Sequence, residues 1–446
     1  MKFLSIQFFL FFVLTFVGFY STNKEKIRIS VLIGSSLFFL TSFFKSILDF
    51  LPIFTSLVLL FLTLIGIFNL PSKIRPIGSL IGIFLNVFLF LLLKDFLPLG
   101  LNLQTIGISY MLFRGIQLIT DAGDGGLKSK DISIENLLLF LISFLTFTAG
   151  PIQHFDQFCQ SLKKSLLSPI TAINWHVFTK RSLYGAIKFC LIAPILVDTQ
   201  SDILSLNYPI ALNVALASNI FLLYIYVSFS AYMDWMIAFG SALNFFIPEN
   251  FDRPHRAESF LDLWNRWHLT LSLTFRIYVF NPVLRILMSQ PLNKFRDSNG
   301  IFGLFIVFFL LGYWHGSEVR FAIFGTLLGL VAVFSWIFEK KELFKKFNNL
   351  FHFLSPEKIT TIKAGLSLGI LSICCIFTWP GYDLSDALML LNGPIRVLLI
   401  TAICCLFATL ICQAAFFIEE LISFIDSKKL GAKILQNIPL RLGLFI

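Results

Sequence analysis

Charged residues are scarce in this chain. Only 13% of its 446 residues are Asp, Glu, Lys or Arg, 57% are hydrophobic, and the mean hydropathy is +0.83. A soluble protein of this length needs far more polar surface, and no polar stretch here is long enough to build a separate core. The scarcity of charge excludes a soluble globular protein and predicts an all-α, polytopic integral membrane protein.

Other absences exclude several functions. The seven cysteines are odd in number and lack a CxxC spacing, so we expect small packing residues rather than disulfides. No HExxH or HxxxH spacing predicts a metal site, and Asp121–Gly126 lacks the Gly-Lys-Ser/Thr of a phosphate loop. No tightly bound cofactor is expected. The net charge is +10, but the chain has no separate basic domain. We therefore expect the lysines and arginines to lie in cytoplasmic loops, and we expect no nucleic-acid partner.

Apolar runs are what the chain does contain, and Phe alone occurs 55 times. Some runs are too short or too polar to cross a bilayer, which predicts about eleven spans, with the other runs re-entrant or interfacial. The run 3–20 has a single preceding lysine and no small-residue cleavage site, so it is predicted to be a retained first span. The runs lie near residues 3–20, 29–44, 50–70, 77–93, 104–120, 134–150, 182–197, 208–229, 231–248, 269–290, 300–316, 321–338, 364–380 and 393–417.

Polar stretches between these runs predict orientation and surface elements. The loop after the first run has three basic residues and the loop after the third has two, which places the N-terminus outside the cell. The basic residues are Lys24, Lys26, Arg28, Lys73 and Arg75. We expect a loop at 121–133, interfacial helices within 152–181, an unusually charged segment at 248–268 and an amphipathic surface helix at 418–446.

Two histidines lie in or beside apolar sequence. His268 ends the series Asn265-Arg266-Trp267-His268, and His315 lies in Trp314-His315-Gly316. An ionisable residue at membrane depth is costly and indicates a functional site. A neutral imidazole can take the proton of a hydroxyl group, and burial favours the neutral form, so a buried base is expected. The other four histidines, His154, His176, His255 and His352, lie in polar or interfacial segments and are predicted to be surface residues.

An ordered series of motifs surrounds these histidines. It comprises Tyr232-Met233-Asp234, Pro248-Glu249-Asn250-Phe251, Trp264-Asn265-Arg266-Trp267-His268, Arg276-Ile277-Tyr278 and Trp314-His315-Gly316. Together with Gly150-Pro151-Ile152, the series covers roughly 148–330 and resembles the membrane-bound O-acyltransferase superfamily. It is most similar to the bacterial branch that modifies cell-envelope polymers, which includes alginate-type O-acetylases and teichoic acid D-alanyltransferases.

The resemblance implies roles for individual residues. His315 matches the family histidine expected to act as general base, and His268 matches a second histidine that positions the acyl donor, holds a channel or supports His315. A buried reaction chamber is implied, lined by Tyr232, Asp234, Asn265, Arg266, Trp267, Arg276 and Trp314. Two structural alternatives stay open: His268 as a histidine that only stabilises the fold, and Asp234 as the ion-pair partner of an arginine.

The chain departs from the family pattern at three places. Ile277 stands where related acetylases have Asp, Asn281-Pro282-Val283-Leu284 replaces Pro-Leu-Gly-Gly, and Val319 replaces a Trp. These departures argue against an alginate-like acceptor and leave the two histidines unchanged.

The sequence therefore predicts one integral domain over 1–446, with N-terminal spans at 1–147, core motifs at 148–330 and C-terminal spans at 331–446. We expect an O-acyltransferase of the bacterial cytoplasmic membrane that moves acetyl from a cytoplasmic thioester, acetyl-CoA, to a hydroxyl of an envelope or secreted polysaccharide. The alternative donor is an acyl or D-alanyl carrier protein acting toward a teichoic-acid-like polymer. A periplasmic acyltransferase is the partner expected by analogy. The rival class is a transporter or flippase, which would have pseudo-symmetric halves with paired broken helices.

Overall fold

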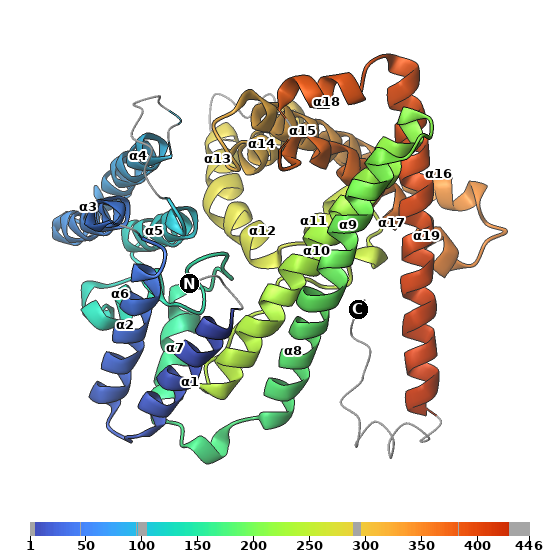
Figure 1. Ribbon diagram of the computed structural model, residues 1–446. Coiled ribbons are helices and arrows are strands. Elements are labelled where there is room, and N and C mark those ends of the chain that lie inside the picture. Colours follow the sequence, from blue (N-terminus) through green and yellow to red (C-terminus); the bar gives the residue numbers. More distant parts are fainter. Residues whose placement is uncertain are drawn as a thin grey trace. The chain divides into compact units, whose positions relative to one another are not determined.

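The computed structural model describes residues 5–44, 46–94, 96, 105–288, 296–381 and 383–427 (Figure 1). Regular structure in these residues is helical, which confirms the predicted all-α class. The one pairing of extended backbone found there is an isolated antiparallel bridge between Phe251 and Trp267. Contacts divide the chain into two compact units, Met1–Phe178 with Met236–Pro248, and Thr179–Trp235 with Glu249–Ile446. The predicted boundaries at residues 147 and 330 stay predictions.

The first unit is built mainly from helices α1 to α7. Helices α3, α4 and α5 contact one another, and α2 contacts α1, α6 and α7. Short 3-10 turns, Ile47–Phe50, Ser129–Asp131 and Ile170–Ala172, connect these elements. The bounds are α1 Ile6–Tyr20, α2 Glu25–Thr41, α3 Leu51–Asn69, α4 Arg75–Leu93, α5 Ile108–Gly123, α6 Ile134–Ile142 and α7 Phe155–Leu167.

Two buried arginines hold the first unit together. Arg28 of α2 donates to the carbonyl oxygens of Leu166 (2.8 Å) and Ser168 (2.7 Å), at the end of α7. Arg114 of α5 donates to the carbonyl oxygens of Phe140 (2.9 Å) and, after α6, Thr146 (2.6 Å). A buried charge must be satisfied by such partners, and the last carbonyls of a helix carry negative partial charge. Arg28, predicted as a loop cation, is thus also a packing residue.

The second unit contains α9, most of α8 and α10, and α11 to α19. Two segments widen to π-helix, Lys188–Ile192 between α8 and α9 and Arg276–Phe280 between α12 and α13. Pro254–Arg256 and Cys375–Thr378 form 3-10 turns. The bounds are α8 Trp175–Ile187, α9 Ala193–Ser205, α10 Ile210–Ala242, α11 Phe260–Trp264, α12 Leu269–Phe275, α13 Asn281–Leu287, α14 Arg296–Tyr313, α15 Val319–Lys340, α16 Leu343–Leu350, α17 Pro356–Cys374, α18 Leu384–Leu390 and α19 Pro394–Ser427.

Small residues let two helix pairs of this unit approach closely. Helices α14 and α15 cross at Gly312, where an added Cβ would overlap the backbone of Gly325. Helices α17 and α19 cross at Gly365 and Gly369, where an added Cβ would overlap Thr409 or Cys405. Glycines spaced four apart are a common way to pack helices within membranes. The α14–α15 crossing matters most, because the turn after α14 carries His315.

Helix α10 corrects one prediction. The runs 208–229 and 231–248 were expected as separate elements, yet Ile210–Ala242 is one helix of 33 residues. Polar residues lower the hydropathy in the middle of this stretch, but the side chains of Ser218, Asn219 and Ser230 bond back to their own helix. Ser230 Oγ, for example, donates to the carbonyl oxygen of Val227 (3.1 Å). Such bonds let polar residues remain within a helix.

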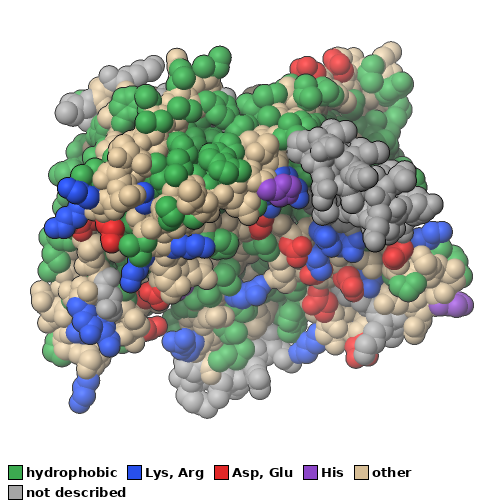
Figure 2. All heavy atoms as spheres, turned by 90° about the horizontal axis from the view of Figure 1, so that it is seen from below, with side chains coloured by type: hydrophobic (Ala, Val, Ile, Leu, Met, Phe, Trp, Pro, Cys, Tyr) green, Lys and Arg blue, Asp and Glu red, His purple; other side chains and the backbone are tan. Residues whose placement is uncertain are grey.

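The described helices are those of a multi-pass membrane protein. Seven of them are long and apolar enough to cross a membrane, and Ile6–Tyr20 and Ser298–Tyr313 are shorter apolar helices. Large apolar side chains such as Leu80, Phe84 and Leu398 are exposed. Figure 2 shows apolar surface of this kind beside areas of charged side chains. A surface this apolar fits lipid rather than water, and the number of spans stays a prediction.

Two of the predicted surface segments can be compared directly with the structure. The loop predicted at 121–133 begins later than expected, because α5 continues to Gly123; turns and a short 3-10 segment, Ser129–Asp131, follow it. Helix α19 continues to Ser427, so most of the predicted surface helix at 418–446 lies outside the described residues.

Candidate active site

His268 is held at the start of α12 by a buried asparagine. Its backbone is left-handed (φ 48°), and its ring packs edge-on against Phe229, with 4.7 Å between centroids. Asn250 is completely buried and lies beside this turn. Its carbonyl oxygen accepts from Leu269 N (2.9 Å), and its Oδ1 accepts from Thr270 N (3.1 Å) and Thr270 Oγ1 (2.7 Å). These bonds fix the backbone that follows His268.

The environment of His268 keeps its imidazole neutral. The residue is 9% exposed. Burial and, to a smaller extent, the charge of His315 lower the pKa of His268 to about 3. Low polarity disfavours the charged form of an imidazole. At physiological pH His268 is therefore a neutral group that can donate one hydrogen bond and accept another, within electrostatic range of His315.

His315 lies in the turn between α14 and α15. Its ring contacts those of Trp314 and Phe324, with centroid separations of 4.8 and 5.7 Å. Its side chain is exposed, so the expected buried base is wrong for this residue. The physical reason is that α14 ends at Tyr313, one residue beyond the crossing at Gly312, and His315 lies in the turn that follows the packed helices. His268 is buried, whereas the side chain of His315 is exposed.

Two predicted chamber residues share a cavity. Arg276 Nη2 donates to Asn265 Oδ1, and both residues line a cavity of about 360 Å³. Arg276 is the first residue of a π-helix, a feature that often marks functional sites. Ser272 and Trp264 also line this cavity, whereas the two histidines are not among its lining residues. The guanidinium of Arg276 and the carboxylate of Glu339 are the charged groups among the lining residues, most of which are apolar.

The other predicted chamber residues lie around the His268 turn or beside His315. Arg266 Nε pairs with Asp262 (3.0 Å), so the charge of Arg266 is balanced within the loop. Trp267 is buried against Tyr226, with 5.8 Å between ring centroids, and Tyr232 packs on Phe229 at 6.1 Å. Trp314 lies beside His315. A single chamber that contains all of these side chains stays a prediction.

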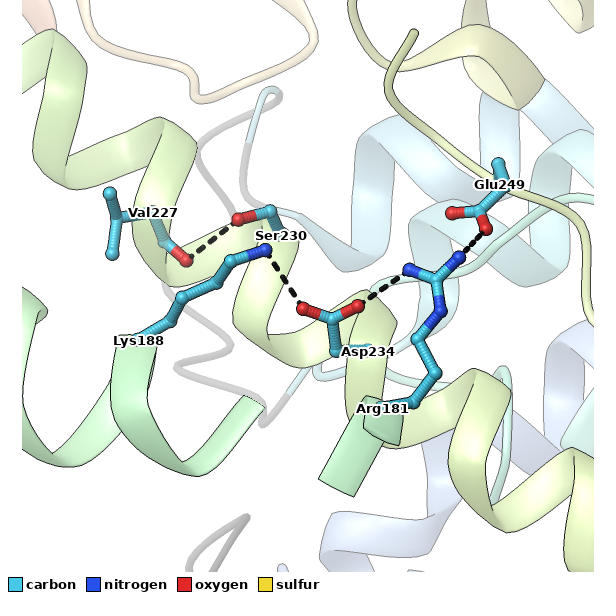
Figure 3. Close-up of polar contacts among 6 residues, drawn as sticks. All are labelled: Arg181, Lys188, Val227, Ser230, Asp234 and Glu249. Carbon is cyan, nitrogen blue, oxygen red and sulfur yellow. Dashed lines mark hydrogen bonds and ion pairs between the residues drawn. The ribbon is translucent and has the colours of Figure 1, made fainter. Parts of the chain in front are cut away.

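Asp234 is the buried centre of an ion-pair cluster whose outer members, Arg181 and Glu249, are 29% and 49% exposed. It is 1% exposed. Its Oδ1 lies 2.6 Å from Arg181 Nη1 and its Oδ2 lies 2.8 Å from Lys188 Nζ. Figure 3 shows that Arg181 also reaches Glu249 with its second nitrogen. Two cations therefore face two carboxylates, which is the balance that buried charge requires, and the alternative of an arginine partner for Asp234 holds.

Sequence reasoning missed the supporting residues of this site. These are Asn250, Arg181 and Lys188, whose partners lie far away in the chain. Only Asn250 belongs to a motif of the sequence analysis, Pro248-Glu249-Asn250-Phe251. His255 was expected at the surface but is 7% exposed, between Phe416 and a small apolar pocket that Trp267 also lines. His154, His176 and His352 are exposed, as predicted. No group of three metal-ligating side chains was found in the described residues.

Comparison with known proteins gives a family match and several relatives. The model of the MBOAT, membrane-bound O-acyltransferase family, matches residues 16–340. Teichoic acid D-alanyltransferase of Bacillus subtilis is 28% identical over 264 residues, 58% of this chain and 64% of that protein. The Streptococcus thermophilus protein of the same name is 27% identical, over 54% of this chain and 60% of its own length.

A second group of relatives has a different named activity. The probable alginate O-acetylase of Pseudomonas aeruginosa is 26% identical over 228 residues, 51% of this chain and 42% of that protein. The chain thus spans less than two thirds of the length of each of these three relatives. The expected similarity to the envelope-polymer branch is confirmed. Because the family match covers well over half of its residues, the chain belongs to the membrane-bound O-acyltransferase family.

Proposed function

We propose that this chain transfers an acyl group, acetyl in the first instance, from a cytoplasmic thioester to a hydroxyl of a cell-envelope or secreted polysaccharide. The observation that carries the proposal is an accessible histidine, His315, within electrostatic range of a buried neutral one, His268, in a chain of this family. A transporter or flippase is the rival, but the polar residues concentrate between 230 and 320 rather than in paired halves.

The proposed reaction needs one base and one site for negative charge. An imidazole nitrogen of His315 takes the acceptor hydroxyl proton as the oxygen attacks the thioester carbonyl carbon. The C–O bond forms and the carbonyl oxygen becomes an oxyanion. When this intermediate collapses, the C–S bond breaks, and the leaving thiolate takes the proton back from His315. The same residue therefore serves as base and then as acid.

Neutral His268 and the Arg276 cavity would support these steps differently. A neutral imidazole can donate its N–H to the oxyanion or to the donor carbonyl without introducing a full charge. Arg276 supplies a cation for an anionic part of the donor, such as the phosphates of acetyl-CoA or of a carrier-protein thioester. A periplasmic acyltransferase partner that completes transfer to the polymer belongs to the same proposal.

D-alanyl transfer is the second candidate. It is favoured by the longer alignments with teichoic acid D-alanyltransferases than with the alginate-type relative. The donor would then be a D-alanyl carrier protein and the acceptor a teichoic-acid-like polymer. The chemistry assigned to His315 is the same for both, because each donor is a thioester and each acceptor a hydroxyl.

The test is the ester content of purified envelope polysaccharide from wild type, a deletion strain, and a strain with His315→Ala at equal membrane level. We expect both mutants to lose the same ester, and mass spectrometry of the released acid distinguishes acetate from D-alanine. Full ester content in the His315→Ala strain would refute the base assignment. An unchanged ester profile in the deletion strain would favour the transporter.

A further inference from the structure

The loop after α10 connects His268 to the ion-pair cluster of Asp234. Asn250 binds the backbone at Leu269 and Thr270, and Asp252 N donates to the carbonyl oxygen of Arg266 (2.9 Å). The loop therefore holds the His268 turn on both sides. Glu249, immediately before Asn250, pairs with Arg181. Because Glu249 and Asn250 are adjacent in the chain, an ion pair that holds Glu249 restricts how far Asn250 can move.

Arg181 joins this loop to α10 by ion pairs, in addition to the direct contact of Asn250 Nδ2 with Met233 Sδ (3.4 Å) and the packing of Phe251 on Phe229. Its Nη1 contacts Asp234, whose other carboxylate oxygen is held by Lys188, and its Nη2 contacts Glu249. Lys188 is 5% exposed, is the first residue of the π-helical segment, and places its Nζ 2.8 Å from Asp234 Oδ2. A guanidinium presents several donors in a rigid plane and can contact two carboxylates at once, whereas an ammonium group is a single point charge. The bridge therefore depends on geometry as well as on charge.

We propose that Arg181 is a positioning residue: it ties the loop of Glu249 and Asn250 to α10 and thereby determines where His268 lies. The inference rests on the proposed function for its effect on turnover, but the position of His268 can be measured without any reaction. A cluster that merely stabilised the protein would change the folded yield and leave the exposure of residue 268 in folded protein unchanged.

The first experiment measures the exposure of position 268 by thiol labelling. The parent is the full chain in detergent with His268→Cys and Cys190→Ser, because Cys190 is the exposed native cysteine. Arg181→Lys and Glu249→Ala are added singly, and labelling at 268 is quantified by peptide mass spectrometry. We expect about tenfold faster labelling in both, since a loop that loses its anchor opens locally more often.

The matched control is Glu258→Ala. Glu258 is an exposed acidic residue of the same charged segment, and its carboxylate lies 3.9 Å from Lys363 rather than from Arg181. We expect its labelling rate to equal that of the parent. Unchanged labelling with Arg181→Lys, or equally faster labelling with Glu258→Ala, would overturn the proposal.

The second experiment measures turnover in the background with native His268. Arg181→Lys should lower kcat about tenfold with little change in KM. The double variant, Arg181→Lys with Asn250→Ala, should have a kcat no lower than that of the worse single variant, because both residues act through the same chain of contacts. Multiplicative losses would contradict the proposal. If labelling increases while wild type transfers no acyl group, the proposed function fails and the positioning role stands.

Discussion

His268 and His315 lie in opposite environments, one buried and neutral and the other exposed at a turn. A general base must meet the proton it removes, so exposure suits His315. A donor to a developing oxyanion gains strength where water is excluded, which suits His268. The contrast also explains why His268 needs a support such as Asn250: its left-handed backbone is uncommon for a residue other than glycine and must be held by its neighbours.

Asn250→Ala should therefore damage both stability and activity. Thr270 N–H and Oγ1 lose their buried acceptor, a change that typically costs about 1–3 kcal/mol. Thermal unfolding in detergent and transfer rate are the measurements. Asn86→Ala is the control, because Asn86 is likewise buried and hydrogen-bonded, to Gly82 and Thr63, but lies in the first unit. We expect Asn86→Ala to lower stability with normal turnover per folded molecule, and equal losses of turnover would contradict the assignment.

The burial of His255 predicts that acid destabilises the second unit. Burial, followed by the charges of Arg256 and Arg253, lowers the pKa of His255 to about 4. In the unfolded chain His255 has a pKa of about 6.5, so it binds a proton at a pH where the folded protein keeps it neutral. The contribution of neutral His255 to stability is therefore fully present above pH 6.5 and is lost as the pH falls toward 4. The loss should reach about 3 kcal/mol. His255→Gln should flatten the decrease in apparent Tm over this pH range, whereas His176→Gln, at an exposed position, should not.

At the level of elements, close helix packing places the turn that carries His315. Gly312 and Gly325 allow α14 and α15 to touch, and the turn that follows α14 presents His315. The position of His315 therefore depends on how closely these two helices cross.

Gly312→Ala tests this dependence. Its Cβ would overlap the Gly325 backbone and push the helices apart, which typically costs about 1–3 kcal/mol. We expect lower stability and a lower kcat in the folded fraction. Gly300→Ala on the same helix has nothing within 4 Å of the new Cβ and should be neutral or slightly stabilising. Similar behaviour of the two variants would argue against the crossing as the determinant.

For the whole molecule, periodicity and hydropathy predict helices better than they predict contacts between distant residues. Apolar runs gave most of the helices, because burial in lipid requires such runs. They divided α10 wrongly because hydropathy ignores polar side chains that bond to their own helix. The His268 and His315 motifs are local and readable, whereas the Arg181 and Asp234 pair spans 53 residues. His255 was placed wrongly because a polar local sequence does not reveal that α19 covers it.

Orientation in the membrane is a further prediction at this scale. Lys24, between α1 and α2, and the basic residues of the first turn of α2 predict that this connection is cytoplasmic and that the next one is outside. In Cys190→Ser protein, Ser46→Cys should react with an impermeant maleimide in intact cells, whose outer membrane is permeabilised where one is present. Lys24→Cys should react only after the cytoplasmic membrane is broken. The reverse pattern would invert the assigned orientation.

The role of His315 as general base is tested most directly by comparing two acyl acceptors in His315→Ala protein. A hydroxyl acceptor needs its proton removed, whereas hydroxylamine attacks a thioester without a base. We expect His315→Ala to slow transfer from the labelled thioester to the polysaccharide hydroxyl by about 10²–10⁴-fold. Release of the acyl group to hydroxylamine should change by less than about tenfold. Equal loss with both acceptors, or no loss with either, would contradict the role of His315 as general base.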